Sequence, residues 1–191
     1  MIFYLGEFLK SAWGPARLLQ SYAVLIAIAL YSGFFITQTI LPKFYGLLPS
    51  DRGREFTLTA EAAKGKPTGS GVFFITLYVL LCFIFVPMDL LQIGILILTW
   101  LMMLTGFLDD RSSKGWGEYI KAFLDLVITV VAAVLLERYL SSTSSDGQLK
   151  FWFPFFTDPI SIPKWLYIII TVIMLWVSVN TTNCTDGVDG L

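Results

Sequence analysis

The sequence predicts an all-α polytopic membrane protein, on the basis of its composition and of its long apolar runs. Of the 191 residues, 56% are hydrophobic and only 14% are charged, whereas soluble domains are about 45–50% apolar and about 25% charged. Five apolar runs of 16–22 residues are close to the length that crosses about 30 Å of hydrocarbon. Because backbone groups in lipid must find their hydrogen-bond partners within the segment, we expect each run to be a helix.

The expected spans cover residues 21–41, 71–86, 90–108, about 119–140, and 164–179. Pro42 and Pro87 are expected to end the first two spans, since proline lacks the backbone N–H that a helix needs. Asp89 is expected to cap the third. Together the spans predict one membrane domain over residues 1–191.

Residues 141–163 differ from the spans. They open with a Ser/Thr/Gly stretch and continue as QLKFWFPFF. This pattern predicts a short extended or hairpin element at the membrane interface, where Trp and Phe side chains form aromatic belts.

Five consecutive spans bring three polar, glycine-rich segments to one face of the membrane: residues 42–70, 109–117 and 180–191. Eight of the 13 lysines and arginines fall on this side, if Lys121 at the start of the fourth span is included, and five on the other. An excess of basic residues marks the cytoplasmic side. We therefore expect the three segments to be cytoplasmic and the element at 141–163 to be non-cytoplasmic.

Net charge and histidine content limit the possible chemistry. The net charge is −1 and the chain has no histidine. Nucleic-acid binders usually carry a clustered basic surface, so we expect no nucleic-acid partner. Catalysis by these residues would have to use carboxylates, amides and lysines.

The first polar segment contains AKGKPTGSG at residues 63–71. Its glycines allow close backbone approach to a ligand, and the helix that follows favours anions at its N-terminus. With Lys64, Lys66 and Thr68, the segment is interpreted as a phosphate-binding loop. A basic, flexible loop at the interface is the alternative.

The second polar segment begins with GFLDDR, where the third span ends. Asp109 and Asp110 repel one another and so invite a divalent cation or a basic partner; a solvated helix end is the alternative. Lys121 and Asp125, four residues apart in the fourth span, are expected to pair with each other. Charges within a membrane are often functional, although a simple helix-surface pair explains this one as well.

The third polar segment, NTTNCTDGVDGL at residues 180–191, is rich in oxygen ligands. If it is helical, Asn183, Asp186 and Asp189 share one face because they are three residues apart. Such a face would hold a metal or a metal–pyrophosphate complex. A polar loop of caps and turns is the alternative.

These three segments, in this order, resemble the motifs of the polyprenyl-phosphate N-acetylhexosamine-1-phosphate transferase family. The closest branch transfers phospho-N-acetylmuramoyl-pentapeptide. The resemblance covers the whole chain but about half of a family member, which is expected to have about ten helices. It therefore implies that residues 1–191 are the N-terminal half of a larger transferase.

The resemblance also implies a reaction. Undecaprenyl phosphate would attack UDP-N-acetylmuramoyl-pentapeptide to give lipid I and UMP, with Mg²⁺ as cofactor, at the cytoplasmic face of the inner membrane in peptidoglycan synthesis. The implied catalytic residues are Asp109, Asp110, Asp186 and Asp189, the implied metal ligands are Asn183 and Asp189, and the implied substrate-binding residues are Lys64 or Lys66, Thr68, Lys121, Gly190 and Leu191.

Other interpretations stay open. Arg111 directly after the aspartate pair is more typical of the sister branch that uses UDP-N-acetylglucosamine, and Asp125 stands where the first branch commonly has glutamine. A small transporter and a non-catalytic membrane half-protein that acts as an assembly partner are alternatives of other classes. The resemblance leaves open whether the protein forms a homodimer.

Overall fold

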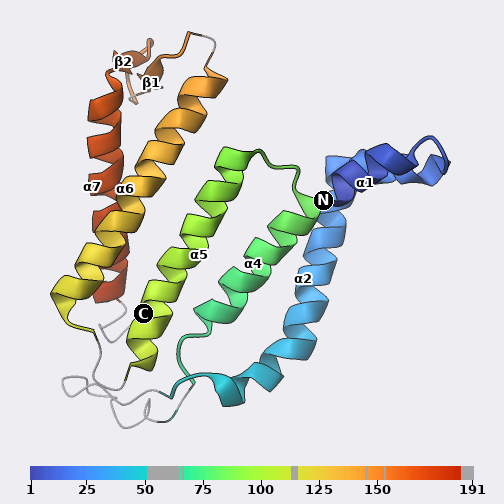
Figure 1. The fold of residues 1–191 in the computed structure, drawn as a ribbon, viewed down its shortest axis with the longest axis horizontal. Helices are drawn as coiled ribbons and strands as arrows, with labels where there is room; N and C mark the ends of the chain where they lie inside the picture. Colours follow the sequence, from blue (N-terminus) through green and yellow to red (C-terminus); the bar gives the residue numbers. More distant parts are fainter. Residues whose placement is uncertain (51–64, 66, 113–115, 145, 153, 186–191) are drawn as a thin grey trace. The chain divides into compact units, whose positions relative to one another are not determined.

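The computed structural model describes residues 1–50, 65, 67–112, 116–144, 146–152 and 154–185, and Figure 1 shows their fold. These residues form two compact units, which divide between Asp89 and Leu90. Each unit is described by itself, and the expectation of a single membrane domain stays a prediction.

The described part of the first unit contains three α-helices and two short 3-10 helices: α1 (Ile2–Leu9), η1 (Gly14–Gln20), α2 (Tyr22–Phe44), η2 (Tyr45–Leu47) and α4 (Gly71–Phe85). Helix α1 folds back on η1 at Gly6, where an added Cβ would lie 2.8 Å from the Cβ of Leu19. Glycine therefore permits this close approach. The amino group of Met1 donates to the carbonyls of Phe83 and Ile84, at the helix end where the dipole favours a cation.

Proline ends one of these helices but not the other. Helix α4 stops at Phe85 because Val86, which precedes Pro87, is held in an extended conformation (φ −91°, ψ 125°). The expectation that Pro42 ends the first span is wrong, since α2 continues through Pro42 to Phe44. Proline removes only one backbone donor, and here that loss falls in the last turn of a 23-residue helix.

The second unit, over its described residues, consists of three helices and a hairpin: α5 (Leu90–Arg111), α6 (Glu118–Thr143), β1 (Leu149–Phe151), β2 (Ile160–Ile162) and α7 (Lys164–Thr185). Helix α6 packs against both α5 and α7. The hairpin predicted within residues 141–163 is confirmed, since β1 and β2 pair antiparallel with Lys150 opposite Ser161.

The turn before the hairpin is held by Asp146. Its carboxylate accepts hydrogen bonds from the ammonium of Lys150, the hydroxyl of Ser144 and the backbone N–H of Gln148. These donors, that of Lys150 above all, hold the pKa of Asp146 well below its usual range.

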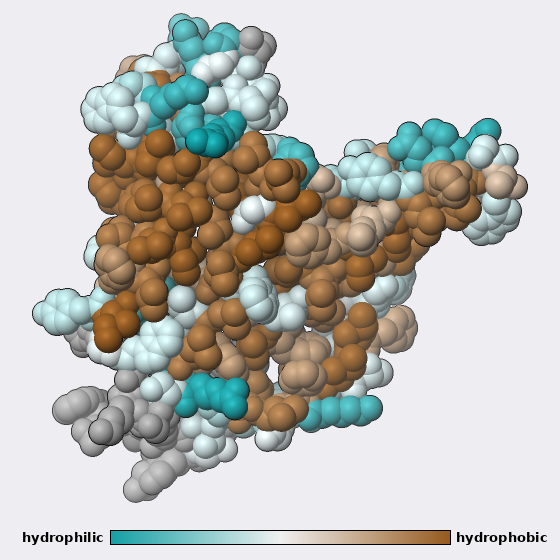
Figure 2. Space-filling model, in the orientation of Figure 1, coloured by the Kyte–Doolittle hydropathy of each residue, from teal (hydrophilic) through white to brown (hydrophobic). Residues whose placement is uncertain are grey.

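Among the described residues, four helices are long and apolar enough to cross a membrane: Tyr22–Leu47, Leu90–Arg111, Tyr119–Thr143 and Lys164–Thr182. The remaining predicted span, 71–86, corresponds to α4, which has only 15 residues, or roughly 22 Å at 1.5 Å per residue. At most 17% of the residues in any of the four spans are buried within the protein, and Figure 2 shows hydrophobic side chains covering the helices. Because such surfaces are stable in lipid, the chain is a multi-pass membrane protein.

Candidate active site

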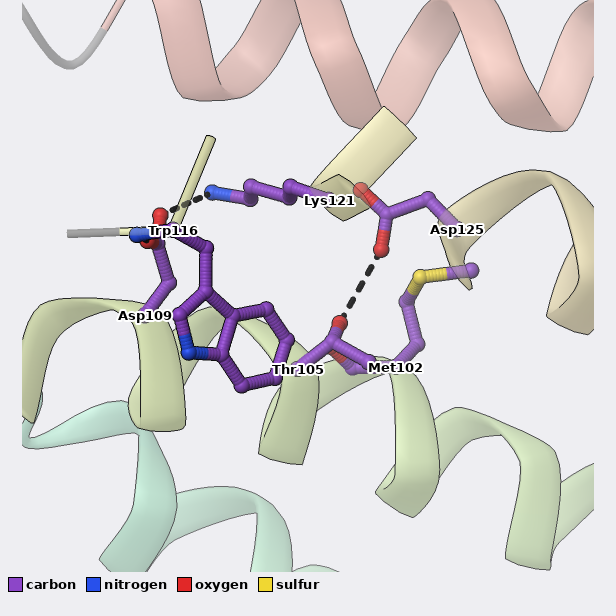
Figure 3. A network of polar contacts seen from close by, with 6 residues as sticks. All are labelled: Met102, Thr105, Asp109, Trp116, Lys121 and Asp125. Carbon is purple, nitrogen blue, oxygen red and sulfur yellow. Dashed lines mark hydrogen bonds and ion pairs between the residues drawn. The ribbon is translucent and has the colours of Figure 1, made fainter. Parts of the chain in front are cut away.

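Asp109 lies in the last turn of α5 and uses both carboxylate oxygens (Figure 3). Oδ1 accepts the backbone N–H of Trp116 at 2.6 Å, and Oδ2 accepts the ammonium of Lys121 at 3.2 Å. The Asp109 and Lys121 side chains are 20% and 13% exposed, so the pair is sheltered and still open at one edge. Asp109 thus joins the end of α5 to the beginning of α6, and it is positioned by both.

Asp110 has a different environment from its neighbour. Consecutive residues of a helix point about 100° apart, and while Asp109 faces α6, Asp110 is exposed. Of the two carboxylates predicted from the sequence, Asp109 is therefore sheltered and paired with Lys121, while Asp110 lies at the surface.

Deeper in the same helix pair, Asp125 of α6 meets Thr105 of α5 (Figure 3). The Thr105 hydroxyl lies 3.0 Å from Oδ1 of Asp125 and 2.7 Å from the Met102 carbonyl oxygen. Asp125 is only 1% exposed. Its second oxygen, Oδ2, has no hydrogen-bond partner among the described residues.

The predicted pairing of Lys121 with Asp125 is wrong, because Lys121 pairs with Asp109. The spacing along α6 does bring Lys121 and Asp125 to the same face. Because α5 packs antiparallel to α6, however, the Asp109 carboxylate of α5 lies within reach of Lys121. Spacing rules for a single helix do not predict this contact. A third contact between these helices, from the Gln92 amide to the Tyr139 hydroxyl at 2.9 Å, continues the same register toward the other end.

Helix α7 ends near the same site. The indole N–H of Trp176 donates to the carbonyl of Ala122 at 3.0 Å. Ala122 directly follows Lys121 in the chain. Within this unit, the C-terminal ends of α5 and α7 and the start of α6 therefore lie at one end, as Figure 1 shows. The predicted convergence holds for the described residues of these two polar segments.

Most of the third segment lies outside the described residues. Helix α7 extends to Thr185, so Asn183 is helical, but its side chain is not described. Asp186, Asp189, Gly190 and Leu191 also lie outside the described residues, and their roles stay predictions. Among the described residues, no group of three or more His, Cys, Asp or Glu side chains forms a metal site.

The predicted phosphate loop belongs to the first unit. Lys64 and Lys66 lie outside the described residues. Thr68 is anchored to Pro49, whose carbonyl accepts its backbone N–H at 2.8 Å, and Gly65 and Gly69 adopt positive φ angles of 85° and 70°. Such angles favour glycine, so the backbone conformation by itself explains why glycine stands at these two positions. Phosphate binding by this loop stays a prediction.

Two residues of the site were not singled out from the sequence. Thr105 lies four residues before Asp109 and is a lone hydroxyl in an apolar helix turn; that spacing was an available signal. Trp116 contributes its backbone N–H, a group that every residue except proline carries. No side-chain signal could have identified it.

Comparison with known proteins identifies relatives of this chain. Residues 92–191 match the family described as glycosyl transferase family 4. A phospho-N-acetylmuramoyl-pentapeptide-transferase of Treponema pallidum (strain Nichols) is 49% identical over 185 residues, which cover 97% of this chain and 50% of that protein. The proteins of the same name from Aquifex aeolicus and Thermotoga maritima are 26% identical (100% of this chain, 55% of the relative) and 32% identical (67% and 39%).

No solved structure matches the chain. The chain spans about half the length of the curated relatives from Treponema and Aquifex. The family match begins at Gln92, near the start of α5, and includes Asp109, Lys121 and Asp125. Because it covers more than half of the chain, this polytopic membrane protein belongs to glycosyl transferase family 4.

Proposed function

We propose that this chain is part of an enzyme that transfers phospho-N-acetylmuramoyl-pentapeptide from UDP to undecaprenyl phosphate, giving lipid I and UMP. The observation that carries the proposal is the sheltered Asp109–Lys121 pair at the end of three apolar helices, with the exposed Asp110 beside it. A membrane-embedded acceptor with a phosphate head needs charged groups of both signs at such an end. The names of the relatives supply the substrate class.

In the proposed reaction, an oxygen of the lipid phosphate attacks the phosphorus attached to the sugar. A new phosphoanhydride bond forms there, and the bond from that phosphorus to the UMP oxygen breaks. Because both reactants are anions, catalysis depends mainly on positioning and charge neutralisation. Lys121 is a sheltered cation for a substrate phosphate, and Asp109 orients or deprotonates the lipid phosphate.

The oxygen donors near this site fit Mg²⁺, which binds proteins through one or two carboxylates and completes its coordination with water and substrate phosphates. Asp110 presents an exposed carboxylate of the required kind, and Asn183 and Asp189 are the proposed ligands from the third segment. The ion would neutralise charge that develops on the phosphate oxygens. Asp186 is proposed to support this centre.

The remaining proposed contacts concern the nucleotide. Lys64 or Lys66, with Thr68, would bind its phosphates, and Gly190 and Leu191 would contribute to the uridine pocket. We place this site at the cytoplasmic face of the inner membrane, because most lysines and arginines fall on the side of the three polar segments.

The proposal is tested by UMP release from protein purified from its native membrane. The assay supplies undecaprenyl phosphate and Mg²⁺, with UDP-N-acetylmuramoyl-pentapeptide and UDP-N-acetylglucosamine in parallel reactions. Release with the muramoyl donor supports the proposal. Release with the glucosamine donor alone would assign the protein to the sister branch, and no release from folded protein would refute transferase activity.

Variants test the residue assignments in the same assay. Asp110→Asn and Asp189→Asn each keep the side-chain shape and remove one negative charge. Each is expected to lower UMP release by at least about 100-fold, while the melting temperature stays close to that of the wild type. If both variants kept most of the activity, the assignment of these aspartates would be wrong.

A further inference from the structure

Asp125 is a buried carboxyl group that the proposed reaction does not use. It is 1% exposed, on the side of α6 that faces α5. Only Oδ1 is engaged, by Thr105, and Oδ2 has no partner among the described residues. Burial of a carboxyl oxygen without a hydrogen bond is costly. We therefore expect a cation or a hydrogen-bond donor to reach Oδ2 of Asp125 in some state of the protein.

Lys121 is the cation placed to do so. It precedes Asp125 by four residues on the same face of α6, and side chains at that spacing are neighbours on a helix. Figure 3 shows Lys121 extending toward Asp109 while Asp125 reaches Thr105; the second carboxyl oxygen of Asp125 is directed away from Thr105, on the side of Lys121 in this view. Lys121 therefore has two carboxylates as neighbours: Asp109, which is partly exposed at the helix end, and Asp125, which is buried one turn deeper.

We infer that Asp125 is a second acceptor for the Lys121 ammonium, which contacts Oδ2 of Asp125 in place of Asp109 when Asp109 is engaged by the lipid phosphate. Because an ammonium has three N–H donors, Lys121 can hold a substrate phosphate at the same time. This exchange of partners rests on the proposed function, because binding of the lipid phosphate to Asp109 triggers it. Asp125 is thus a positioning residue. It keeps Lys121 within the site when its first partner is occupied, and it does not itself contact substrate.

Thr105 makes this second position specific. Its place is fixed by α5, and its single hydroxyl proton is shared between the carbonyl of Met102 in the same helix and Oδ1 of Asp125. Contact with Oδ1 then fixes the orientation of the Asp125 carboxyl group and leaves Oδ2 as the open acceptor among the described residues. The two contacts, Asp109–Lys121 and Thr105–Asp125, are four residues apart on both helices, so a single register of α5 against α6 serves both.

A double-mutant cycle tests the inference without catalysis. Asp109→Asn, Asp125→Asn and the double variant are made in the full-length protein, and the rate of thermal unfolding is measured. In Asp109→Asn, Lys121 pairs with Asp125 instead, so this single variant should change the unfolding rate only slightly. The double variant should unfold at least about fivefold faster than the product of the two single effects predicts. Effects that simply multiply would overturn the inference.

The same cycle in a Lys121→Met background is the matched control. There the coupling between positions 109 and 125 should disappear, since it runs through the ammonium of Lys121. Persistence of the coupling without this lysine would mean that a different contact carries it, and the inference would be wrong. A purely structural role of Asp125 would also leave the coupling unchanged.

Chemical labelling supplies a second measurement that needs no change at the buried position. Lys121 is acetylated with an amine reagent, and the modified peptide is quantified over time by mass spectrometry. In Asp109→Asn, labelling of Lys121 should stay as slow as in the wild type, because Asp125 retains the ammonium. Labelling that accelerates to the rate of Lys150, an exposed lysine, would overturn the inference. Neither readout requires UMP release, so failure of the proposed reaction would be recognised separately.

Discussion

Removal of the ammonium of Lys121 is the most informative single perturbation of the site. Lys121→Met keeps the unbranched stem and deletes the charge-assisted hydrogen bond to Asp109, which spans 3.2 Å. Such bonds contribute about 1.5–3 kcal/mol. Both side chains are less than a third exposed, so solvent screening reduces this only partly. The Trp116 N–H still satisfies the other oxygen of Asp109. We therefore expect a loss of about 1–2 kcal/mol, or about 3–6 °C in melting temperature for a chain of this size.

The expected loss of activity is much larger than the loss of stability. If Lys121 neutralises a substrate phosphate, its removal should lower kcat/KM for UMP release by at least about 100-fold. Lys150→Met is the matched control, because it also deletes a lysine–aspartate pair but lies in β1, at the other end of this unit from the site. That variant should keep its activity. Lys121→Met with more than half of the wild-type rate, or an equal loss in Lys150→Met, would refute the assignment.

Further expectations concern stability. Gly6→Ala should destabilise the protein by about 1–3 kcal/mol, because the new Cβ would lie 2.8 Å from a carbon of η1; Gly106→Ala, with nothing within 4 Å, should be neutral or gain up to about 1 kcal/mol, and equal melting temperatures for the two would contradict this. Asp146 has a lowered pKa, so its contribution to stability is present above the ordinary aspartate value and is lost as pH falls below about 4 toward the folded-state value. The melting-temperature difference between wild type and Asp146→Asn should therefore shrink over that range, and a constant difference would refute the linkage. Tyr139→Phe should cost about 0.6 kcal/mol by removing the partner of the Gln92 amide; a denaturation curve identical to that of the wild type would show that this bond contributes nothing.

Apolar length and turn residues predicted most of the fold. The end of α4 at Phe85 and the beginning of α5 at Leu90 follow from Pro87 and its effect on Val86, which are local effects. The β hairpin was also recognisable, because aromatic residues follow a polar stretch. The end of α2 was not, since a single missing donor at Pro42 is tolerated when the rest of the helix is intact.

The candidate site was predicted in its residue types but not in its pairing. Asp109 and Lys121 were both singled out, yet Lys121 was assigned to Asp125 by the spacing along one helix. Nothing in the sequence indicated that Asp125 is 1% exposed. Burial depends on which face of α6 meets α5, and an all-round apolar helix carries no pattern that marks this face.

The amino-acid sequence by itself determined that this protein spans the membrane several times and that Asp109 and Asp110 lie at the end of a span, because both properties depend on composition and spacing along the chain. Only the tertiary structure decided that Asp109 takes the ammonium of Lys121 and that Asp125 is left buried with one oxygen unpartnered among the described residues. The physical reason is that antiparallel packing of α5 on α6 brings together residues 12 and 20 positions apart. Contacts at such separations depend on the register of the two helices. This register cannot be derived from the spacing rules of a single helix.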